Sequence, residues 1–355
     1  MDINGEIIEA MILGGAVLGG GGGGSIAEGR RIGHAALELG RPWLVSIDEL
    51  DDNDLLATVS AVGAPAAKER FVAPSDFIEA TKLLLDHLDH GLSGFIASEN
   101  GGTSTVHGLL QSAVLGVPVV DAPCNGRAHP TGVMGSMGLS SLPEYLSRQA
   151  AVGGNPESGR RLQLYVEAAV PAADALVRQA AVQAGGMVAV TRSPVPARYV
   201  REHGAPGAIV QAIQLGRILM KERIAGGRAV AGRLAAELRG DVIAAGEIAA
   251  LELETRGGYD VGRLTVGDIE LSFLNEYMTA EKQGQRVATF PDLITTLDYE
   301  DGTPRASAQL QPSARVLVLW APRESLILGA GMRDPANFKP VEEILQRPIL
   351  RYVFP

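Results

Sequence analysis

A nearly uncharged segment, residues 100–143, contains most of the side chains that could do chemistry in this chain. It holds only one acid, Asp121, and one base, although 20% of the residues in the chain are charged. The only cysteine, Cys124, and two of the six histidines, His107 and His129, also lie there. Reactive side chains in an interior segment acquire shifted pKa values, because burial and neighbouring groups favour one protonation state. The segment is therefore predicted to form part of a functional site.

Two kinds of chemistry fit these side chains. A thiol close to a guanidinium and an imidazole acquires a lowered pKa, so Cys124 near Arg127 and His129 is predicted to act as a thiolate nucleophile, with Asp121 or His129 moving the proton. The same types of side chain also bind divalent metal ions, and the candidate ligands are Glu99, His107, Asp121, Cys124 and His129. Their spacing matches no standard metal motif, so the sequence leaves the cofactor open, with a divalent metal ion as the candidate.

Glu99 and Asp121 are predicted to lie at one edge of a sheet, because each follows directly on a predicted strand. Ligands of parallel sheets bind outside the carboxyl ends of the strands, and neighbouring strands are about 5 Å apart, so both carboxylates could reach one small ligand. Each acid could instead cap a helix or a turn. Arg127 could pair with a substrate carboxylate or neutralise Asp121. His107, about one turn into a predicted helix, is more typical of a core histidine.

A run of six glycines, Gly19 to Gly24, followed by Ser25 is the second candidate feature. Glycine N–H groups before a helix can bind an anion, and glycine also permits close approach of the backbone to a ligand or to another segment. The run lacks the Lys-Ser/Thr pair of a P-loop, and no clear strand precedes it, so nucleotide binding is not indicated. The residues predicted to line the binding site are Gly22, Gly23, Gly24 and Ser25.

The elements that must position these residues alternate between strand and helix. Helices are predicted over 5–18, 25–39, 75–88, 104–115, 172–184, 207–221 and 228–238. Short apolar strands are predicted over 43–47, 55–62, 94–98, 117–120, 162–168 and 187–191. This alternation predicts an α/β fold, with a mostly parallel sheet that carries helices on both faces.

The pattern changes near Gly240. From there to about residue 320 the apolar runs are short, strand-like and separated by turn residues, which predicts a smaller β-rich, barrel-like domain. We therefore expect an α/β domain over 1–238, with the glycine run and the cysteine segment, and a β-rich domain over 239–355. The tail from residue 332 could pack on either domain.

Composition argues against several classes of partner. The 355-residue chain has a net charge of −10, only 5% aromatic residues and no basic run, which argues against nucleic acids and anionic membranes. Residues 10–27 are uncharged but contain eight glycines, which makes a poor membrane span. The N-terminus is acidic, unlike a signal peptide, and a single cysteine excludes an intramolecular disulfide. We therefore expect a protein of the reducing cytoplasm.

Six motifs, in order along the chain, give it a resemblance to a known family. They are the glycine run with Ser25, ENGG at 99–102, GVPVVDA at 116–122, GRAHP at 126–130, FLNEYMTAE at 273–281 and FPDLITTLD at 290–298. Together they resemble the S-methyl thiohydantoin desulfurase family, whose members occur alone or beside hydantoinase/oxoprolinase-type proteins. The resemblance covers nearly the whole chain and implies an α/β domain followed by a β-rich domain.

The resemblance also implies a set of site residues. Together with Asn100 of the ENGG motif and Gly21 to Gly24, they are Glu99, Gly101, Gly102, Asp121, Gly126, Arg127, Pro130, Asn275, Glu276 and Asp292. The chain departs from the family pattern in three places: near Cys124, where an Asp is usual, at His129, where a Phe is usual, and at Thr131, where a Glu is usual. All three differences fall in the predicted site and bear on the substrate.

Two functions of different classes are consistent with these features. One is an enzyme that hydrolyses or desulfurises a small cyclic amide or thioamide, such as a hydantoin-like or thiohydantoin-like ring. The other is a non-catalytic subunit or ligand-binding partner of a hydantoinase/oxoprolinase-type enzyme. The expected partners are a small-molecule substrate and either further copies of the chain, in a homo-oligomer, or such an enzyme. Because Asn275, Glu276 and Asp292 fall in the β-rich half, the site is predicted to lie between the two domains, with the glycine run lining it.

Overall fold

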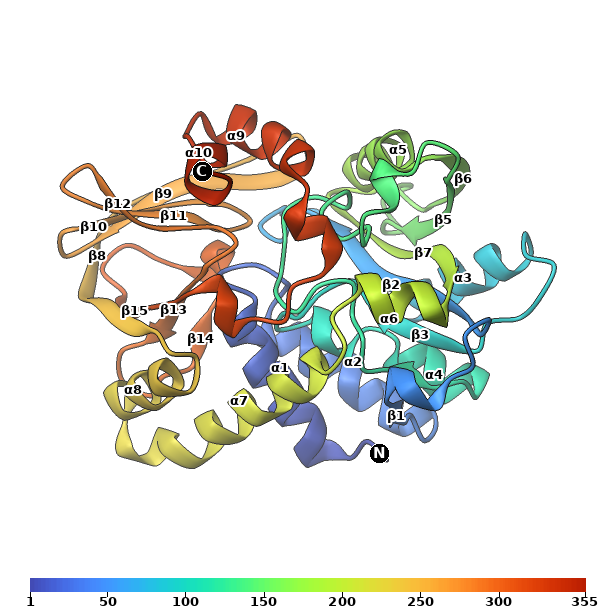
Figure 1. The fold of residues 1–355 in the computed structure, drawn as a ribbon, viewed down its shortest axis with the longest axis horizontal. Coiled ribbons are helices and arrows are strands. Elements are labelled where there is room, and N and C mark those ends of the chain that lie inside the picture. Colours follow the sequence, from blue (N-terminus) through green and yellow to red (C-terminus); the bar gives the residue numbers. More distant parts are fainter.

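The computed structural model describes residues 1–355 as ten α-helices and fifteen strands in two sheets (Figure 1). The helices are α1 (Gly5–Leu18), α2 (Ile26–Leu39), α3 (Pro74–Leu85), α4 (Leu109–Leu115), α5 (Val170–Gln183), α6 (Ala197–His203), α7 (Ala208–Glu222), α8 (Gly227–Glu237), α9 (Lys339–Leu345) and α10 (Leu350–Val353). The first sheet contains β1 (Leu44–Val45), β2 (Leu55–Gly63), β3 (Gly94–Ala97), β4 (Val119–Val120), β5 (Leu146–Gly153), β6 (Leu162–Ala169) and β7 (Met187–Pro196). The second contains β8 (Asp241–Arg256), β9 (Tyr259–Val266), β10 (Ile269–Leu274), β11 (Glu276–Lys282), β12 (Gln285–Thr289), β13 (Leu293–Asp298), β14 (Pro304–Arg305) and β15 (Arg315–Ala321). None of the helices is both long enough and apolar enough to span a membrane.

The first sheet has the strand order β1-β4-β3-β2-β7-β5-β6. The pairs β1–β4, β4–β3 and β3–β2 are parallel, as the alternation of short strands and helices predicts. The pairs on the other side of β2 are antiparallel. The sequence analysis does not predict strand β5. Its buried positions include the polar residues Ser147 and Gln149, so it lacks the apolar pattern of a buried strand.

Helices cover both faces of this sheet, as predicted. Successive residues of a strand point to opposite faces. Ala150 of β5 packs in one apolar cluster with Leu84 of α3, whereas the next residue, Ala151, packs in another cluster with Val177 of α5. The mixed α/β part of the molecule is therefore a sheet between two helical layers.

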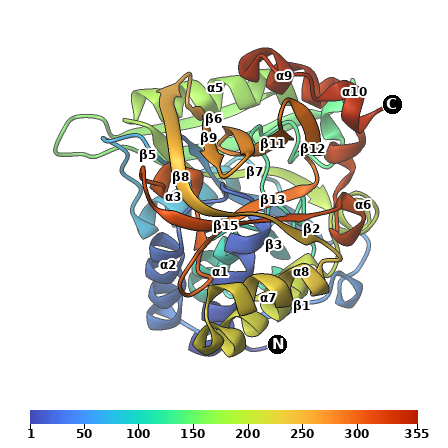
Figure 2. The same cartoon turned by 90° about the vertical axis from the view of Figure 1, so that its left-hand side faces the viewer.

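The second sheet has the order β12-β11-β10-β9-β8-β15-β13-β14, and every pair in it is antiparallel. This confirms the antiparallel sheet that the short runs after Gly240 predict. Its strands are hydrogen-bonded in one series from β12 to β14, and closure into a barrel stays a prediction. Figure 2 looks onto this sheet, with β8 and β15 facing the viewer and α7 and α8 below them.

The C-terminal segment packs on the second sheet. Phe338, Val341 and Ile349 share a buried cluster with Leu274 of β10. Met134, from the loop after His129, joins the same cluster, so the tail also contacts a segment that belongs to the first sheet. The tail thus covers the seam between the two halves of the molecule (Figure 1). The domain division at residues 238 and 239 stays a prediction.

Helices α1 and α7 pack with their backbones in near contact. A β-carbon at Gly14 of α1 would overlap the carbonyl group of Ala212, and one at Gly216 of α7 would overlap the carbonyl group of Ala10. Only glycine allows such an approach. Because α1 leads into the glycine run and α7 begins beside the loop after β4, this contact fixes two segments that border the predicted site.

The α1–α7 contact leads to a stability prediction with a matched control. Gly216→Ala is expected to lower the free energy of unfolding by about 1–3 kcal/mol, because the added methyl group overfills a tight contact. Gly232→Ala, on the exposed face of α8 where a β-carbon would meet no atom within 4 Å, is expected to raise it by up to about 1 kcal/mol. Urea unfolding of both variants measures the difference. Equal effects would contradict the tight contact.

Candidate functional site

A pocket of about 840 Å³, including its open mouth, lies between the two sheets. The first sheet contributes Ser98 and Glu99, directly after β3, and the loop that follows β4 adds His129. The second sheet contributes Asn275 and Glu276, at the start of β11. A pocket therefore lies at the place predicted for the site, between the two halves of the chain. Its place agrees with the rule that ligands bind beyond the carboxyl ends of parallel strands.

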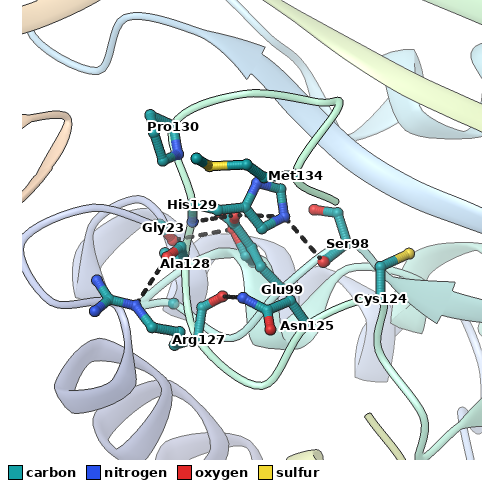
Figure 3. Close-up of polar contacts among 12 residues, drawn as sticks. Gly23, Ser98, Glu99, Cys124, Asn125, Arg127, Ala128, His129, Pro130 and Met134 are labelled. Atoms are coloured by element: carbon teal, nitrogen blue, oxygen red, sulfur yellow. Dashed lines mark hydrogen bonds and ion pairs between the residues drawn. The ribbon is translucent and has the colours of Figure 1, made fainter. Parts of the chain in front are cut away.

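Glu99 is held at this pocket by hydrogen bonds to both of its carboxylate oxygens (Figure 3). Ser104 Oγ donates to Oε1 at 3.0 Å, and the backbone N–H of His129 donates to Oε2 at 3.0 Å. His129 Nε2 lies 3.4 Å from the same Oε2. The Glu99 side chain remains 12% exposed and lines the pocket. This carboxylate is thus oriented and reachable, which suits a proton acceptor.

Glu276 is the second acid of the pocket and is almost completely buried. Burial and the nearby charge of Glu99 raise the pKa of Glu276 well above its usual range, although Arg127 acts in the opposite direction. Its Oε2 has no hydrogen-bond partner within the protein. The backbone of Gly22 lies against Oε1 so closely that any side chain at Gly22 would overlap it. Burial therefore favours the protonated form of Glu276, which makes it a potential proton donor in the same pocket as Glu99.

His129 places an imidazole beside Glu99. Burial lowers the pKa of His129; Glu99 opposes this effect and the positive charge of Arg192 adds to it. Nδ1 is buried without a hydrogen-bond partner, and Gly135 leaves room for the ring, because a β-carbon there would overlap it. A neutral imidazole has one donor and one acceptor, so His129 can pass a proton to or from Glu99.

His107 borders the pocket at a break in the predicted helix over 104–115. A 3-10 turn, Ser104–Val106, ends at His107, and Gly108 with φ 93° precedes α4. The ring centroid lies 5.2 Å from that of Phe77. Burial lowers the pKa of His107 to about 3, and neither ring nitrogen has a hydrogen-bond partner. His107 is thus a neutral, buried histidine, as its place in an apolar helix suggests, but it also lines the pocket.

The glycine run forms a wall of the pocket. Gly23, Gly24 and Ser25 line it, as predicted. Gly22 lies behind this wall, against Glu276, and borders a smaller neighbouring pocket. Ser25 also caps α2, because its Oγ accepts a hydrogen bond from the backbone N–H of Glu28 at 3.2 Å.

The ENGG segment supports this wall from the first sheet. Gly23, with φ 70°, packs on Gly101 so closely that a side chain at either position would overlap the other residue. Asn100 is fully buried, and its Nδ2 donates to the carbonyl oxygens of Gly126 at 3.2 Å and Ala208 at 2.7 Å. Asn100 and Gly101 do not line the pocket and instead support its wall, and their contact with a substrate stays a prediction.

Asp121 turns away from the pocket and caps α7. Its Oδ1 accepts hydrogen bonds from the backbone N–H groups of Ile209 at 2.7 Å and Val210 at 3.4 Å. Burial raises the pKa of Asp121 to about 6. The expected pairing with Glu99 around one ligand is therefore not present. The physical reason is that the unpaired N–H groups at the start of α7 take the carboxylate as their cap.

Cys124 is also outside the pocket, in a buried apolar cluster. Its Sγ lies 3.2 Å from Thr58 Oγ1, and burial raises the pKa of the Cys124 thiol to about 11. This corrects the expected lowering of the pKa. The neighbours inferred from the sequence do not act on the thiol, because the side chains of Arg127 and His129 lie away from it (Figure 3).

Arg127 links the loop after Cys124 to the second sheet and does not line the pocket. Its Nη1 donates to the carbonyl oxygens of Pro291 at 3.3 Å and Asp292 at 2.5 Å, and its guanidinium lies 4.5 Å over the ring of Phe290. Burial lowers the pKa of Arg127 to about 10. The expected contacts with a substrate carboxylate or with Asp121 are thus replaced by contacts with backbone carbonyls.

The two remaining residues that the resemblance implied in the second sheet differ in their placement. Asn275 lines the pocket, and its Oδ1 accepts a hydrogen bond from the backbone N–H of Asp260 at 2.9 Å. Asp292 lies outside: Oδ1 accepts from Arg323 Nε at 2.9 Å, and Oδ2 accepts from Trp320 Nε1 at 3.3 Å. Asp292 is therefore a structural ion-pair partner.

The five candidate metal ligands are not brought together. Glu99, His107 and His129 line the pocket, whereas Asp121 and Cys124 lie outside it. No group of three or more His, Cys, Asp or Glu side chains in the protein is arranged to hold a metal ion. The metal set that the residue types suggested is not formed.

The sequence analysis does not select the three arginines that line the pocket, Arg70, Arg178 and Arg192. Arg178 of α5 donates to the carbonyl oxygens of Gly258 at 2.8 Å and Pro130 at 3.3 Å. Arg192 of β7 lies beside the loop that contains His129. Arg192 directly follows the strand predicted over 187–191, so the rule that selected Glu99 could also have selected Arg192. Arg178 stands within a helix and gives no such signal.

Comparisons with known proteins agree with this architecture. The class of protein is defined by a mixed sheet with helices on both faces, an antiparallel sheet joined to it, and a pocket lined by residues of both. A crystal structure of a protein from Chromobacterium violaceum has the same fold, with a TM-score of 0.69 and 21% sequence identity, over 98% of this chain and 96% of that chain. At this level of identity the likeness shows the fold alone. No curated protein matches the chain.

Two family models match the chain in succession. The S-Me-THD-like N-terminal domain matches residues 6–151, and the S-Me-THD-like C-terminal domain matches residues 168–330. The chain therefore belongs to the S-methyl thiohydantoin desulfurase family, as its motifs indicate.

The helix-capping role of Asp121 can be tested with two variants. Asp121→Ala is expected to lower the free energy of unfolding by about 1 kcal/mol through loss of the cap, whereas Asp121→Asn retains an oxygen acceptor.

The pKa of Asp121 rises from 3.8 to about 6 on folding, so the folded protein binds this proton more tightly than the unfolded chain does. The stability that this group contributes is therefore lost as pH rises from about 4 to about 6. Urea unfolding at pH 4 and pH 7.5 should show wild type losing stability relative to Asp121→Asn at the higher pH; an unchanged difference would contradict the raised pKa.

The environment of Cys124 predicts a thiol that does not react in the folded protein. At pH 8 iodoacetamide should leave Cys124 unmodified, because the thiol is buried and its pKa is about 11. The same reagent in urea should modify it completely, and mass spectrometry reads both results. Rapid modification of the folded protein would instead show that the thiolate is accessible, and it would support the prediction that Cys124 is a nucleophile.

Proposed function

We propose that the protein is a thiohydantoin desulfurase-like enzyme that hydrolyses a small cyclic amide or thioamide, such as a thiohydantoin-like ring. One observation carries the proposal: Glu99 and Glu276 come from different sheets to one pocket, the first hydrogen-bonded as an acceptor and the second kept protonated by burial. Addition of water to carbon needs a base that activates the water and an acid that protonates the ring. Membership of the family supports the same ring chemistry.

The two acids can complete the reaction in two proton-balanced steps. In the first step Glu99 takes a proton from water, the water oxygen bonds to C2 of the ring, and Glu276 protonates the ring nitrogen as its double bond to C2 breaks. In the second step the new hydroxyl group returns a proton to Glu276, the C2=O bond forms and the C2–S bond breaks. The leaving sulfur takes the proton from Glu99. The net reaction turns an S-alkylated thiohydantoin, whose sulfur is bonded to C2 outside the ring, and water into a hydantoin and a thiol, and both carboxyl groups are restored.

The rest of the pocket suits a small polar ring. His129 holds Glu99 in place through its backbone N–H and can share a proton with it. Asn275 lies beside Glu276 and can bond to a ring amide, while Val62 and Phe77 offer apolar contacts to the ring faces. Most other side chains of the lining are polar or charged, which suits a ring that carries amide groups better than a purely apolar ligand.

The proton-transfer roles predict the effect of two conservative variants. Glu99→Gln and Glu276→Gln should each lower kcat by about 100-fold or more, because glutamine has a similar shape but cannot carry the proton. The substrate is an S-methyl thiohydantoin, and mass spectrometry follows the hydantoin product and the released methanethiol. Activity should also fall as pH rises through the raised pKa of Glu276, because the acid must be protonated.

A matched control is available on the same strand. Glu281 pairs with Arg286 and Arg347 and does not line the pocket, so Glu281→Gln should keep turnover. Full activity in both pocket variants would contradict the roles of the two acids. No turnover by the unmodified protein, together with co-purification of a hydantoinase/oxoprolinase-type protein, would favour a non-catalytic subunit instead.

A further inference from the structure

His107 is a buried histidine of the pocket that the proposed reaction does not use. It is 2% exposed and lines the pocket, and neither of its ring nitrogens has a hydrogen-bond partner in the protein. A neutral imidazole has one donor and one acceptor, and leaving both unpaired in a protein interior is unfavourable. A ligand in the pocket that bonds to the ring would remove part of this cost.

The backbone turns the His107 side chain away from the direction of the helix that follows. The 3-10 turn Ser104–Val106 ends at His107, whose own backbone is extended, with φ −62° and ψ 139°. Gly108, with φ 93°, then leads into α4, so the imidazole does not follow the α4 side chains. The break lets His107 line the pocket while the nearby Val106 and Leu109 enter the apolar core.

The walls of the pocket near His107 are apolar. Its ring centroid lies 5.2 Å from that of Phe77 of α3. Glu28 also lines the pocket, but its carboxylate pairs with Arg31. The apolar lining residues that belong to the same core cluster as Phe77, or pack against it, are Ile32, Ala61 and Val72. Such walls suit a hydrocarbon arm of a ligand.

The surroundings of His107 also differ in charge from those of the two acids. Burial is the cause that lowers the pKa of His107 to about 3, so its ring is neutral. In contrast, the charges of Glu99 and Arg192 act on the pKa of His129, and Glu99 also acts on the pKa of Glu276. The pocket therefore has a charged part, where we place the reaction, and a part around His107 that suits an uncharged group.

We propose that His107 hydrogen-bonds a neutral hydroxyl or amide group at the end of a short hydrocarbon arm on C5 of the substrate ring. This inference rests on the proposed function, in which the ring contacts Phe77 and reacts at C2. C5 lies on the side of the ring opposite C2, so an arm on C5 points away from the reacting carbon. Because the rings of Phe77 and His107 are neighbours, a short arm is long enough to reach the imidazole.

The test compares neutral ring ligands that differ only at the end of the arm. Calorimetry measures the binding of 5-(2-hydroxyethyl)hydantoin and of 5-propylhydantoin, in which a methyl group replaces the hydroxyl group. The comparison is repeated with arms one carbon shorter and one carbon longer. In at least one pair, the hydroxyl ligand should bind the unmodified protein about tenfold more tightly, because it satisfies a buried polar group. His107→Leu should lose or reverse this preference, and His107→Gln should keep part of it.

Gln111 provides a matched control. It lies in α4, four residues after His107, is fully buried and has an unpartnered Oε1, but it does not line the pocket. Gln111→Leu should therefore keep the whole preference. His107→Leu should in addition raise the midpoint of urea unfolding, because an apolar side chain replaces an imidazole that is unpaired in the free protein.

The outcomes separate this inference from the proposed function. Equal or weaker binding of the hydroxyl ligand in every pair, or a preference that survives in His107→Leu, would overturn the role of His107. If His107→Leu does not fold, a reduced preference in His107→Gln supports the inference and an unchanged one overturns it. Absence of binding of all these rings would also overturn it. Turnover of S-methyl thiohydantoins by the unmodified protein decides the proposed function separately.

Discussion

The glycine run joins the two halves of the molecule around the pocket, and the position of both acids depends on it. The carbonyl oxygens of Gly20 and Gly21 accept hydrogen bonds from the backbone N–H groups of Tyr277 at 2.7 Å and Ser307 at 2.8 Å in the second half. The carbonyl oxygen of Gly23 accepts one from Thr103 at 2.9 Å in the first half. A single stretch without side chains therefore sets the separation of the sheets. The close approach needs glycine, because side chains here would fill the space that these contacts occupy.

This arrangement links backbone packing to the chemistry of the acids. Ser104, which holds Glu99, also donates from its Oγ to the carbonyl oxygen of Gly23 at 3.2 Å. Glu276 lies against Gly22, one residue earlier in the same run. Two carboxyl groups that share a buried site cannot both ionise cheaply, so burial and the charge of Glu99 favour the protonated form of the more buried Glu276. The different roles that we propose for Glu99 and Glu276 thus depend on their different burial, to which the glycine run contributes.

Features that depend on local sequence could be predicted well. The first helix begins at Gly5 as expected, because Asn4 caps it by accepting a hydrogen bond from the backbone N–H of Ile7 at 2.9 Å. The parallel strands and their covering helices follow from apolar periodicity. Strand β5 could not be predicted from apolar periodicity, because several of the residues that tertiary contacts bury in it are polar.

The site was predictable only in part, because sequence position does not tell where a side chain points. Glu99 and Asp121 both follow parallel strands, yet only Glu99 enters the pocket. Asp121 instead accepts hydrogen bonds from backbone N–H groups at the start of α7. The charge-poor segment around Cys124 is interior, as its composition indicates, but its thiol packs against apolar residues. Asn275 and Glu276 lie far along the chain and could be placed at the site through motifs alone.

The buried arginines hold the two sides of the pocket together and shift the protonation of its acidic and imidazole groups. Arg127 and Arg178 donate to backbone carbonyl oxygens on both sides of the seam, so they join loops of the two halves. Their charges also favour the ionised form of Glu276, against the larger effect of burial. Arg192 forms a longer ion pair, with 3.7 Å between its Nη1 and Asp174 Oδ1, and it lines the pocket. Its positive charge adds to the effect of burial in lowering the pKa of His129, so the neutral imidazole beside Glu99 depends on the electrostatics of both β7 and the loop that carries His129.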